Sequence, residues 1–354
     1  MDSMEAIEHK HIPAALVAYT RFHLLARSEV PGVLQEIAAA LPAGLITGPA
    51  YLHIQGFSSY TEGFSAEAGF PVSREFVGGR IRSRTMPAME VLALTHTGPR
   101  AALRETKIGL LNYARARALI SDEFSREVYP AWQDPESPVE IHFVIHNWSR
   151  LLAENLERTL GAPGRASVLQ GDESLPVDAS PETRFEWARL ALTRLESNAS
   201  EHQKYDAVSS CAHVFPAELL DKLRGVYLHA RNGVGDPLAA VDAVLAFMET
   251  DPGWNETEHA RVGRVIHQTK RPADPEAYAA AQSDAERRAA YCFCPVIRAR
   301  LEQGMPVSYC YCGAGWFRQQ WETATGKPVT VEVVRSVLKG DPVCEFATHL
   351  AEDL

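Results

Sequence analysis

The chain has 354 residues, a length that favours two domains because a single hydrophobic core rarely grows beyond about 250–300 residues. Hydrophobic residues make up 46% and charged residues 23%, a globular composition that excludes a largely disordered chain. The formal net charge of −10 argues against a nucleic-acid partner, since phosphates are bound by clustered Lys and Arg.

The N-terminal segment, residues 1–11, carries acidic residues and lacks the apolar stretch of a signal peptide. Along the whole sequence, no window reaches the roughly 18–20 apolar residues that span a bilayer. We therefore expect a cytoplasmic protein without a membrane partner. The sequence leaves the oligomeric state open.

Up to residue 148, apolar runs typical of strands alternate with helical periodicity. A strand, a helix and two strands are predicted, and then the same order recurs. The strands fall at 16–22, 51–55 and 70–77, then at 81–86, 91–95, 127–129 and 139–145; the helices fall at 33–41 and 100–120. This duplication predicts an α+β domain over residues 10–148 with a ligand cleft between its halves.

Two of these predicted strands carry a candidate acidic residue. On the last one, Glu140 and His142 lie on the face opposite the apolar residues, because side chains alternate along a strand. Glu127 lies on the preceding strand, so we expect Glu127 and Glu140 in one cavity. Two buried carboxylates favour a cationic ligand or a shared proton. The alternative is that both are solvated strand residues.

Aromatic side chains would form the walls of this cavity and contribute cation–π contacts. The candidate wall residues are Tyr19, Tyr51, Phe57, Tyr129 and Trp132.

Three short motifs, Thr95-His-Thr-Gly98, Arg126-Glu-Val-Tyr129 and Val139-Glu-Ile-His142, give about 140 residues a resemblance to the GyrI-like family of BmrR-type effector-binding domains. The resemblance implies that Glu127 and Glu140 are pocket acids, with His142 where the family has an aromatic residue. Because some members are hydrolases, it also implies Glu127 as a general base and Tyr129 as an acid.

The sequence therefore predicts that the domain binds a small organic molecule in an acidic, aromatic cleft and hydrolyses a small or electrophilic compound. The alternative is a non-catalytic ligand sensor, without a DNA-binding helix-turn-helix before it.

Residues 149–183 are predicted as a helix followed by a linker, because 161–183 is rich in Gly, Pro, Ser and Asp. Helical periodicity dominates from 184 to about 290, and short strands are expected at 291–294, 309–312 and 329–334. We expect a second α+β domain over 184–354, helical first and then with cysteine-containing strands.

All six cysteines lie in this second part, and in a reducing compartment they are expected as thiols or metal ligands. Two alternating segments would place four thiols on one side of paired strands: Cys292, Cys294, Cys310 and Cys312. These four could bind zinc or an iron–sulfur cluster, although zinc usually takes Cys-x₂₋₄-Cys spacing. The alternatives are a reactive thiol at Cys310 or Cys312, or inert buried thiols.

With Cys211-Ala-His213 and the ending Gly340-Asp-Pro-Val-Cys344-Glu-Phe346, these cysteine pairs resemble L-2-amino-thiazoline-4-carboxylic acid hydrolase-like proteins, related to 4-vinyl reductase-type ligand domains. The resemblance covers about residues 184–350. It implies that zinc is a possible cofactor, since some members bind it through cysteines and others bind only ligands.

Overall fold

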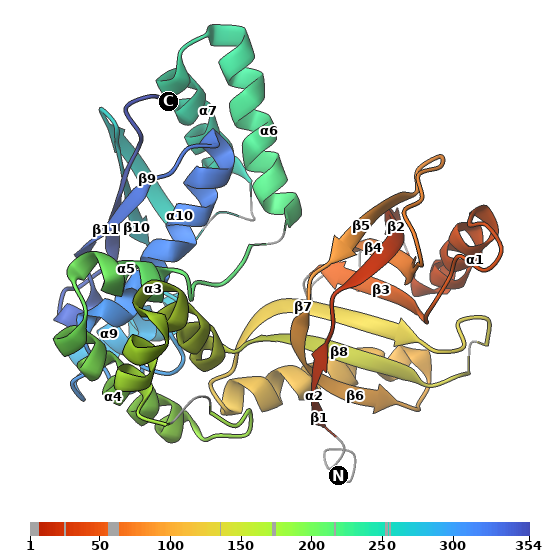
Figure 1. Cartoon of the computed structure of the whole chain (residues 1–354), viewed down its shortest axis with the longest axis horizontal. Helices are drawn as coiled ribbons and strands as arrows, with labels where there is room; N and C mark the ends of the chain where they lie inside the picture. The colour runs from red at the N-terminus through yellow and green to blue at the C-terminus, as the bar shows by residue number, and fades with distance from the viewer. Residues whose placement is uncertain are drawn as a thin grey trace. The chain divides into compact units, whose positions relative to one another are not determined.

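A computed structural model describes residues 7–24, 26–55, 64–134, 136–171, 175–215, 217–251, 254 and 256–354. The chain divides into two compact units, Met1–Asn147 and Trp148–Leu354 (Figure 1). Each unit combines helices with an antiparallel sheet, which confirms the predicted α+β class. Over the described ranges, every helix is too short or too polar to cross a bilayer.

The first unit is an eight-stranded antiparallel sheet with two helices. Its strands are β1 (Glu8–Ile12), β2 (Ala15–Leu24), β3 (Ala50–Gln55), β4 (Phe64–Pro71), β5 (Arg82–Met86), β6 (Met89–His96), β7 (Ile120–Tyr129) and β8 (Val139–His146). Its helices are α1 (Val30–Ala40) and α2 (Leu103–Ala116), preceded by the 3-10 turns Arg27–Glu29 and Arg100–Ala102.

The strand order, β1-β6-β8-β7-β3-β4-β2-β5, contains two copies of one unit. One copy is β2-α1-β3-β4 and the other is β6-α2-β7-β8, and they meet where β3 pairs with β7. The predicted duplication is therefore present in the fold.

Short connections force this sheet to curl. Only two residues separate β1 from β2, and two separate β5 from β6, although each pair lies six strand positions apart. Six positions span about 29 Å in a flat sheet, whereas the chain across two residues reaches at most about 11 Å. The two edges must therefore approach each other, which gives the sheet a concave inner face and a convex outer face.

Both helices cover the outer face. Their apolar stripes include Leu34 and Ile37 of α1 and Leu110 of α2, all at most 1% exposed. Helix α1 packs on β2 and β4, and α2 packs on β6, β7 and β8. The sheet contacts that α1 and α2 make thus lie on the outer face, and the described strands themselves supply the side chains of the inner face.

The strand predictions in this unit need correction at three strands, of which β7 begins at Ile120 and not at residue 127. The strand expected at 70–77 is β4, which ends at Pro71, and β1 was not expected. The small residues Ala66, Ala68 and Gly69 carry little β-propensity, so the sequence pattern placed this strand too late.

The second unit is mostly helical with a four-stranded antiparallel sheet in the order β11-β12-β10-β9. Its helices are α3 (Trp148–Leu169), α4 (Pro181–Asn198), α5 (Glu201–Ser209), α6 (Ala217–Val234), α7 (Pro237–Thr250), α8 (Pro275–Ala280), α9 (Asp284–Tyr291) and α10 (Tyr311–Thr325). Its strands are β9 (Thr257–Val262), β10 (Val265–Lys270), β11 (Thr330–Arg335) and β12 (Glu345–His349), with 3-10 helices at Val307–Cys310 and Val337–Lys339.

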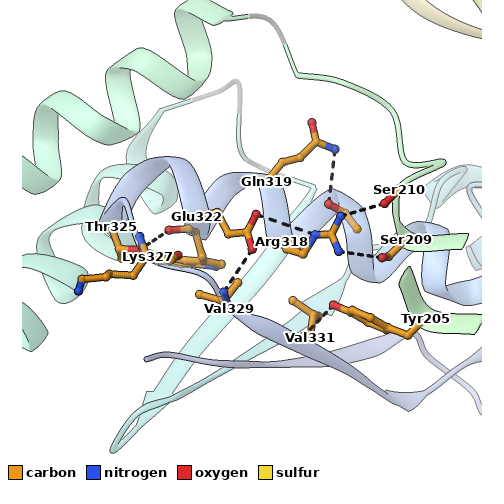
Figure 2. A network of polar contacts seen from close by, with 12 residues as sticks. Tyr205, Ser209, Ser210, Arg318, Gln319, Glu322, Thr325, Lys327, Val329 and Val331 are labelled. Carbon is orange, nitrogen blue, oxygen red and sulfur yellow. Dashed lines mark hydrogen bonds and ion pairs between the residues drawn. The ribbon is translucent and has the colours of Figure 1, made fainter. Parts of the chain in front are cut away.

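Helix α10 is the centre of this unit. Phe317, Trp321 and Ala324 of α10 are fully buried in the core. On the polar side, Arg318 donates hydrogen bonds to the hydroxyls of Ser209 (3.0 Å) and Ser210 (3.3 Å), as Figure 2 shows. These contacts fix α10 against the end of α5.

The predicted linker is largely helical. Helix α3 continues to Leu169 through a kink at Gly161, whose φ of +72° is a left-handed value that favours glycine. Pro163 follows in the first turn after the kink, where proline is tolerated. Gly and Pro thus mark a bend here and not a linker.

The predicted cysteine-containing strands are wrong. Cys292 caps the end of α9, Cys294 follows in a turn, Cys310 ends a 3-10 helix and Cys312 lies in α10. An alternation over only four residues does not distinguish a strand from the end of a helix, and the tertiary packing favours the helix ends. The β9–β10 hairpin lies in the stretch predicted as helical.

Candidate functional site

The two predicted acids lie on opposite faces of the sheet. In the β7–β8 register, Glu127 pairs with Ile141 and Val128 pairs with Glu140. Because paired residues point to the same face, this offset of one residue sends Glu127 to the outer face and Glu140 to the inner face. The prediction that they share one cavity is wrong.

On the outer face, Glu127 is completely buried beneath α2. Its carboxylate lies 2.5 Å from the Lys107 ammonium, forms a second ion pair with Arg27, and accepts a hydrogen bond from the Tyr129 hydroxyl. Burial by itself would raise the pKa of Glu127, but Lys107 and Arg27 outweigh it and lower the pKa to about 2. This acid is held ionised by the protein's own cations.

This arrangement does not suit the predicted catalytic roles. A general base works best with a pKa near the operating pH, and the pKa of Glu127 is shifted the other way. Burial, followed by the charge of Glu127, raises the pKa of Tyr129 well above its usual range. Glu127 and Tyr129 therefore form a closed structural cluster with Lys107 and Arg27.

One predicted wall residue, Trp132, does not lie on the inner face. Trp132 packs edge-on against Phe70, with ring centroids 5.8 Å apart, and Phe70 lies on the outer face of β4. Phe57 lies outside the described residues.

The other four predicted residues meet on the inner face: Tyr19, Tyr51, Glu140 and His142. The sequence analysis did not select the charged residues that accompany them there: Lys10, Glu67, Arg84 and Arg126. Only the strand register connects them with the selected residues: for example, Arg126 pairs with His142, and Arg84 pairs with Val17, two residues from Tyr19.

One chain of hydrogen bonds crosses β7, β8 and β1. Arg126 Nη2 donates to Nδ1 of His142 (3.1 Å), which leaves the imidazole proton on Nε2 to be donated to Glu140 (2.8 Å). Lys10 donates to the same carboxylate oxygen (2.8 Å). Burial above all lowers the pKa of His142, so the ring is a neutral link between Arg126 and Glu140.

A second cluster surrounds Glu67. Its carboxylate accepts hydrogen bonds from Tyr51 (3.0 Å) and Arg84 (2.6 Å), and the Arg84 guanidinium lies 5.1 Å from the centre of the Tyr19 ring. Gly69 pairs with both Tyr19 and Tyr51, and a Cβ there would lie 2.2 Å from the Ala18 carbonyl oxygen. The β2 backbone therefore lies too close to Gly69 for any side chain at this position.

Arg126 lies between these clusters and is only 8% exposed. Its Nη1 lies 2.8 Å from the Met86 sulfur, a contact from β5 that the curl makes possible, and its Nε has no partner. Within the described ranges, no carboxylate forms an ion pair with Arg126. A buried guanidinium without a carboxylate is costly and can be compensated by a bound anion.

The charges of this inner face sum to a positive value, contrary to the expected acidic cleft. Among the described side chains, this face carries five cations, Lys10, Arg21, Arg82, Arg84 and Arg126, and three carboxylates, Glu8, Glu67 and Glu140. The inner face thus favours an anionic ligand over a cationic one.

The four cysteines expected as metal ligands do not form a metal site. In the described part of the chain, no three His, Cys, Asp or Glu side chains are placed to hold a metal ion, so zinc is not supported. All six cysteines are free thiols. Burial raises the pKa of Cys310 to about 12 and that of Cys312 well above its usual range, which removes the two thiols expected to be reactive.

Comparison with solved structures finds partial matches. The C-terminal domain of EcmrR is 25% identical and matches 39% of this chain and 96% of its own, with a TM-score of 0.35. EcmrR in its DNA complex is 26% identical over 39% of this chain and 56% of its own (TM-score 0.35). A hydrolase from Listeria innocua is 11% identical over 39% and 90% (TM-score 0.30).

No protein-family model and no curated protein matches the chain. The resemblance predicted for the second unit stays a prediction.

Proposed function

We propose that the first unit binds a small organic anion, such as an aromatic carboxylate, on the inner face of its curled sheet. The observation that carries the proposal is Arg126, a buried guanidinium with an unpartnered Nε and no carboxylate counter-ion among the described residues. A planar guanidinium binds carboxylates with paired hydrogen bonds, so Arg126 would hold the charged group of the ligand.

The surroundings of Arg126 support a ligand with an aromatic or apolar body. Tyr51 and Met86 belong to one buried apolar cluster with Val17, and Tyr19 packs against it. Tyr19 and Tyr51 lie on strands that both pair with β4 at Gly69, so their rings belong to the same face of the sheet. An aromatic ring there would gain contact with Tyr19 and Tyr51 while its carboxylate reached Arg126.

Of the two functions that the sequence left open, the binding protein is the one proposed. The hydrolase requires Glu127 as a base, and that residue is buried with a pKa of about 2 behind two cations. His142 is neutral but already donates to Glu140 and accepts from Arg126.

Calorimetric titration with three ligands that share one aromatic body tests the proposal: 2-naphthoate, the neutral 2-naphthamide and the cationic 2-naphthyltrimethylammonium. We expect naphthoate to bind most tightly, because a hydrogen bond to a charged group contributes about 1.5–3 kcal/mol. Arg126→Gln should then weaken naphthoate binding by roughly tenfold to a hundredfold and leave the amide unchanged.

Lys327→Gln is the matched control, because it removes one positive charge from an exposed ion pair with Asp353 in the second unit. Tighter binding of the cation than of naphthoate would overturn the proposal. So would an Arg126→Gln variant that binds naphthoate as the unmodified protein does.

A further inference from the structure

A cavity of about 210 Å³ lies beside β9, the edge strand of the four-stranded sheet. Its lining comes from the end of α7, from β9 and from the residue after β10: Met248, Glu249, Thr257, Glu258, His259 and Arg271. At an edge strand, side chains of both faces can border the same hollow. A cavity of about 150 Å³ holds one benzene ring, so a ligand somewhat larger than benzene fits here.

The buried part of the lining contains two polar atoms without a partner. Thr257 is 7% exposed, and neither its hydroxyl nor Nε2 of His259 forms a hydrogen bond with a described residue. The two residues are two positions apart on β9, so they lie on the same face of this strand. A hydroxyl buried without a hydrogen bond costs free energy, which a ligand with a polar group would recover.

The His259 ring is a neutral hydrogen-bonding group. Burial, followed by the charge of Arg271, lowers the pKa of His259 to about 4, so the imidazole carries no charge near pH 7. A neutral imidazole nitrogen pairs with a hydroxyl group as donor or as acceptor. Thr257 and His259 together therefore suit a ligand hydroxyl.

The rim of the cavity, formed by Glu249, Glu258 and Arg271, is exposed and acidic. Arg271 Nε lies 3.6 Å from the Glu258 carboxylate, and the Arg271 backbone N–H donates to the Glu256 carbonyl oxygen (2.8 Å). Glu249 forms no ion pair with a described residue. One cation thus stands against two carboxylates at the rim, and the carboxylate of Glu249 remains available.

The position of Glu249 strengthens this negative potential. It lies in the last turn of α7, where the helix dipole is negative and favours a cation, yet this turn has no basic residue. A bound cation would offset both charges. The described His, Cys, Asp and Glu side chains form no group of three that could hold a metal ion, so an organic cation matches this rim better.

We propose that this cavity binds a small organic ammonium ion that also carries a hydroxyl group, of the size of a phenolic amine. The ammonium would lie at the rim near Glu249, and the hydroxyl would pair with Thr257 and His259. The ring would pack on the thioether of Met248, which is 1% exposed. This inference is independent of the function proposed for the first unit, which concerns an anion.

Calorimetric titration of the full-length protein with three ligands of similar shape tests the two ends of the ligand separately. The ligands are tyramine, phenethylamine, which lacks the hydroxyl, and 4-(2-hydroxyethyl)phenol, which lacks the amine. We expect tyramine to bind most tightly. Loss of the hydroxyl should weaken binding by about tenfold, because Thr257 and His259 then stay unpaired beneath the ligand. Loss of the ammonium should weaken it by about twofold to fivefold, since solvent screens an exposed ion pair.

Two variants assign these differences to the cavity. In Thr257→Val, which keeps the shape of the side chain, the ratio of the affinities for tyramine and phenethylamine should fall. In Glu249→Gln, the ratio for tyramine and 4-(2-hydroxyethyl)phenol should fall toward one. Glu182→Gln removes an exposed acid from the first turn of α4 and is the matched control, so it should leave all three affinities unchanged.

The melting temperature of the free protein checks the folded state of Thr257→Val. It should not fall, because the variant removes a buried hydroxyl that has no partner. A lower melting temperature would show that the hydroxyl is already paired, which removes the basis of the proposal. Tyramine that binds no more tightly than the other two ligands, or affinity ratios that persist in both variants, would also overturn it.

Discussion

The two faces of the eight-stranded sheet treat buried charge in opposite ways. On the outer face, the Glu127 carboxylate forms ion pairs with Lys107 and Arg27, and both Glu127 and Lys107 are completely buried. On the inner face, the hydrogen-bond partners of the Arg126 guanidinium among the described residues are the neutral His142 imidazole and the Met86 thioether. The charge of Glu127 is neutralised within the protein, whereas the positive charge of Arg126 remains available to an anionic ligand.

The difference teaches that a buried acid in this fold is not by itself a sign of a binding site. A buried carboxylate that is already paired with cations helps to stabilise the folded protein. Its removal leaves those cations buried without a counter-ion, which is destabilising. The unpaired charge is the better indicator of function, and here it is a cation on the face without helices.

The largest expected effect comes from breaking the outer-face cluster. Glu127→Gln should destabilise the protein by about 3–5 kcal/mol, because Lys107 and Arg27 remain buried without their counter-ion. Urea unfolding of the variant measures it, and adding Lys107→Met should recover part of the loss. Glu36→Gln, in an exposed pair with Arg80, is the control and should cost less than about 1 kcal/mol. A loss that small for Glu127→Gln would mean that the cluster is not closed.

A pH series sharpens the same point. The pKa of Glu127 is depressed from 4.5 to about 2 in the folded protein. Its contribution is therefore present above about pH 5 and is lost as the pH falls toward 2, in total about 3 kcal/mol. The difference in unfolding free energy between the unmodified protein and Glu127→Gln should shrink over this range. A difference that stays constant with pH would contradict the assignment.

Backbone crowding at the inner face should give a smaller effect. Gly69→Ala should cost about 1–3 kcal/mol, because the added Cβ would lie 2.2 Å from the Ala18 carbonyl oxygen. Gly109→Ala is the matched control, since nothing lies within 4 Å of a Cβ there and alanine favours helix α2. Thermal unfolding compares the two variants, and equal melting temperatures would refute the crowding.

The smallest effect is expected at Glu140, which is 27% exposed on its side chain. Glu140→Gln should change stability by less than about 1 kcal/mol, because its pair with Lys10 is screened by solvent. It should also lower the pKa of His142 further, since the Glu140 charge and hydrogen bond raise it. NMR titration of His142 measures this shift. An unchanged pKa would contradict the interaction between Glu140 and His142.

Much of the first unit was predictable because its signals are local. Alternating apolar residues and a helical period each report on a few neighbouring positions, and the recurrence of both predicted the duplicated topology. The same reasoning selected Tyr19, Tyr51, Glu140 and His142, which the structure brings to one face. It missed Arg126, although that residue stands directly beside the selected Glu127.

The pairing of Glu127 with Glu140 failed for a specific reason. They are thirteen positions apart, and the sequence does not show the register of the two strands across the turn between them. A shift of the register by one residue would have placed both on the same face. In the second unit, the alternating cysteines likewise predicted strands. In the structure, Cys292 caps helix α9 and Cys312 lies in helix α10.

The amino-acid sequence by itself determined the α+β class, the repeated strand–helix order and the residue types available for chemistry, because these depend on composition and short-range periodicity. Only the tertiary structure decided which face each charge occupies, that Glu127 is neutralised by Lys107 and Arg27, and that Cys292 and Cys310 lie at helix ends. Strand register, sheet curl and helix packing bring together residues that are far apart in the chain. A register shift of one residue moves a side chain from one face of the sheet to the other.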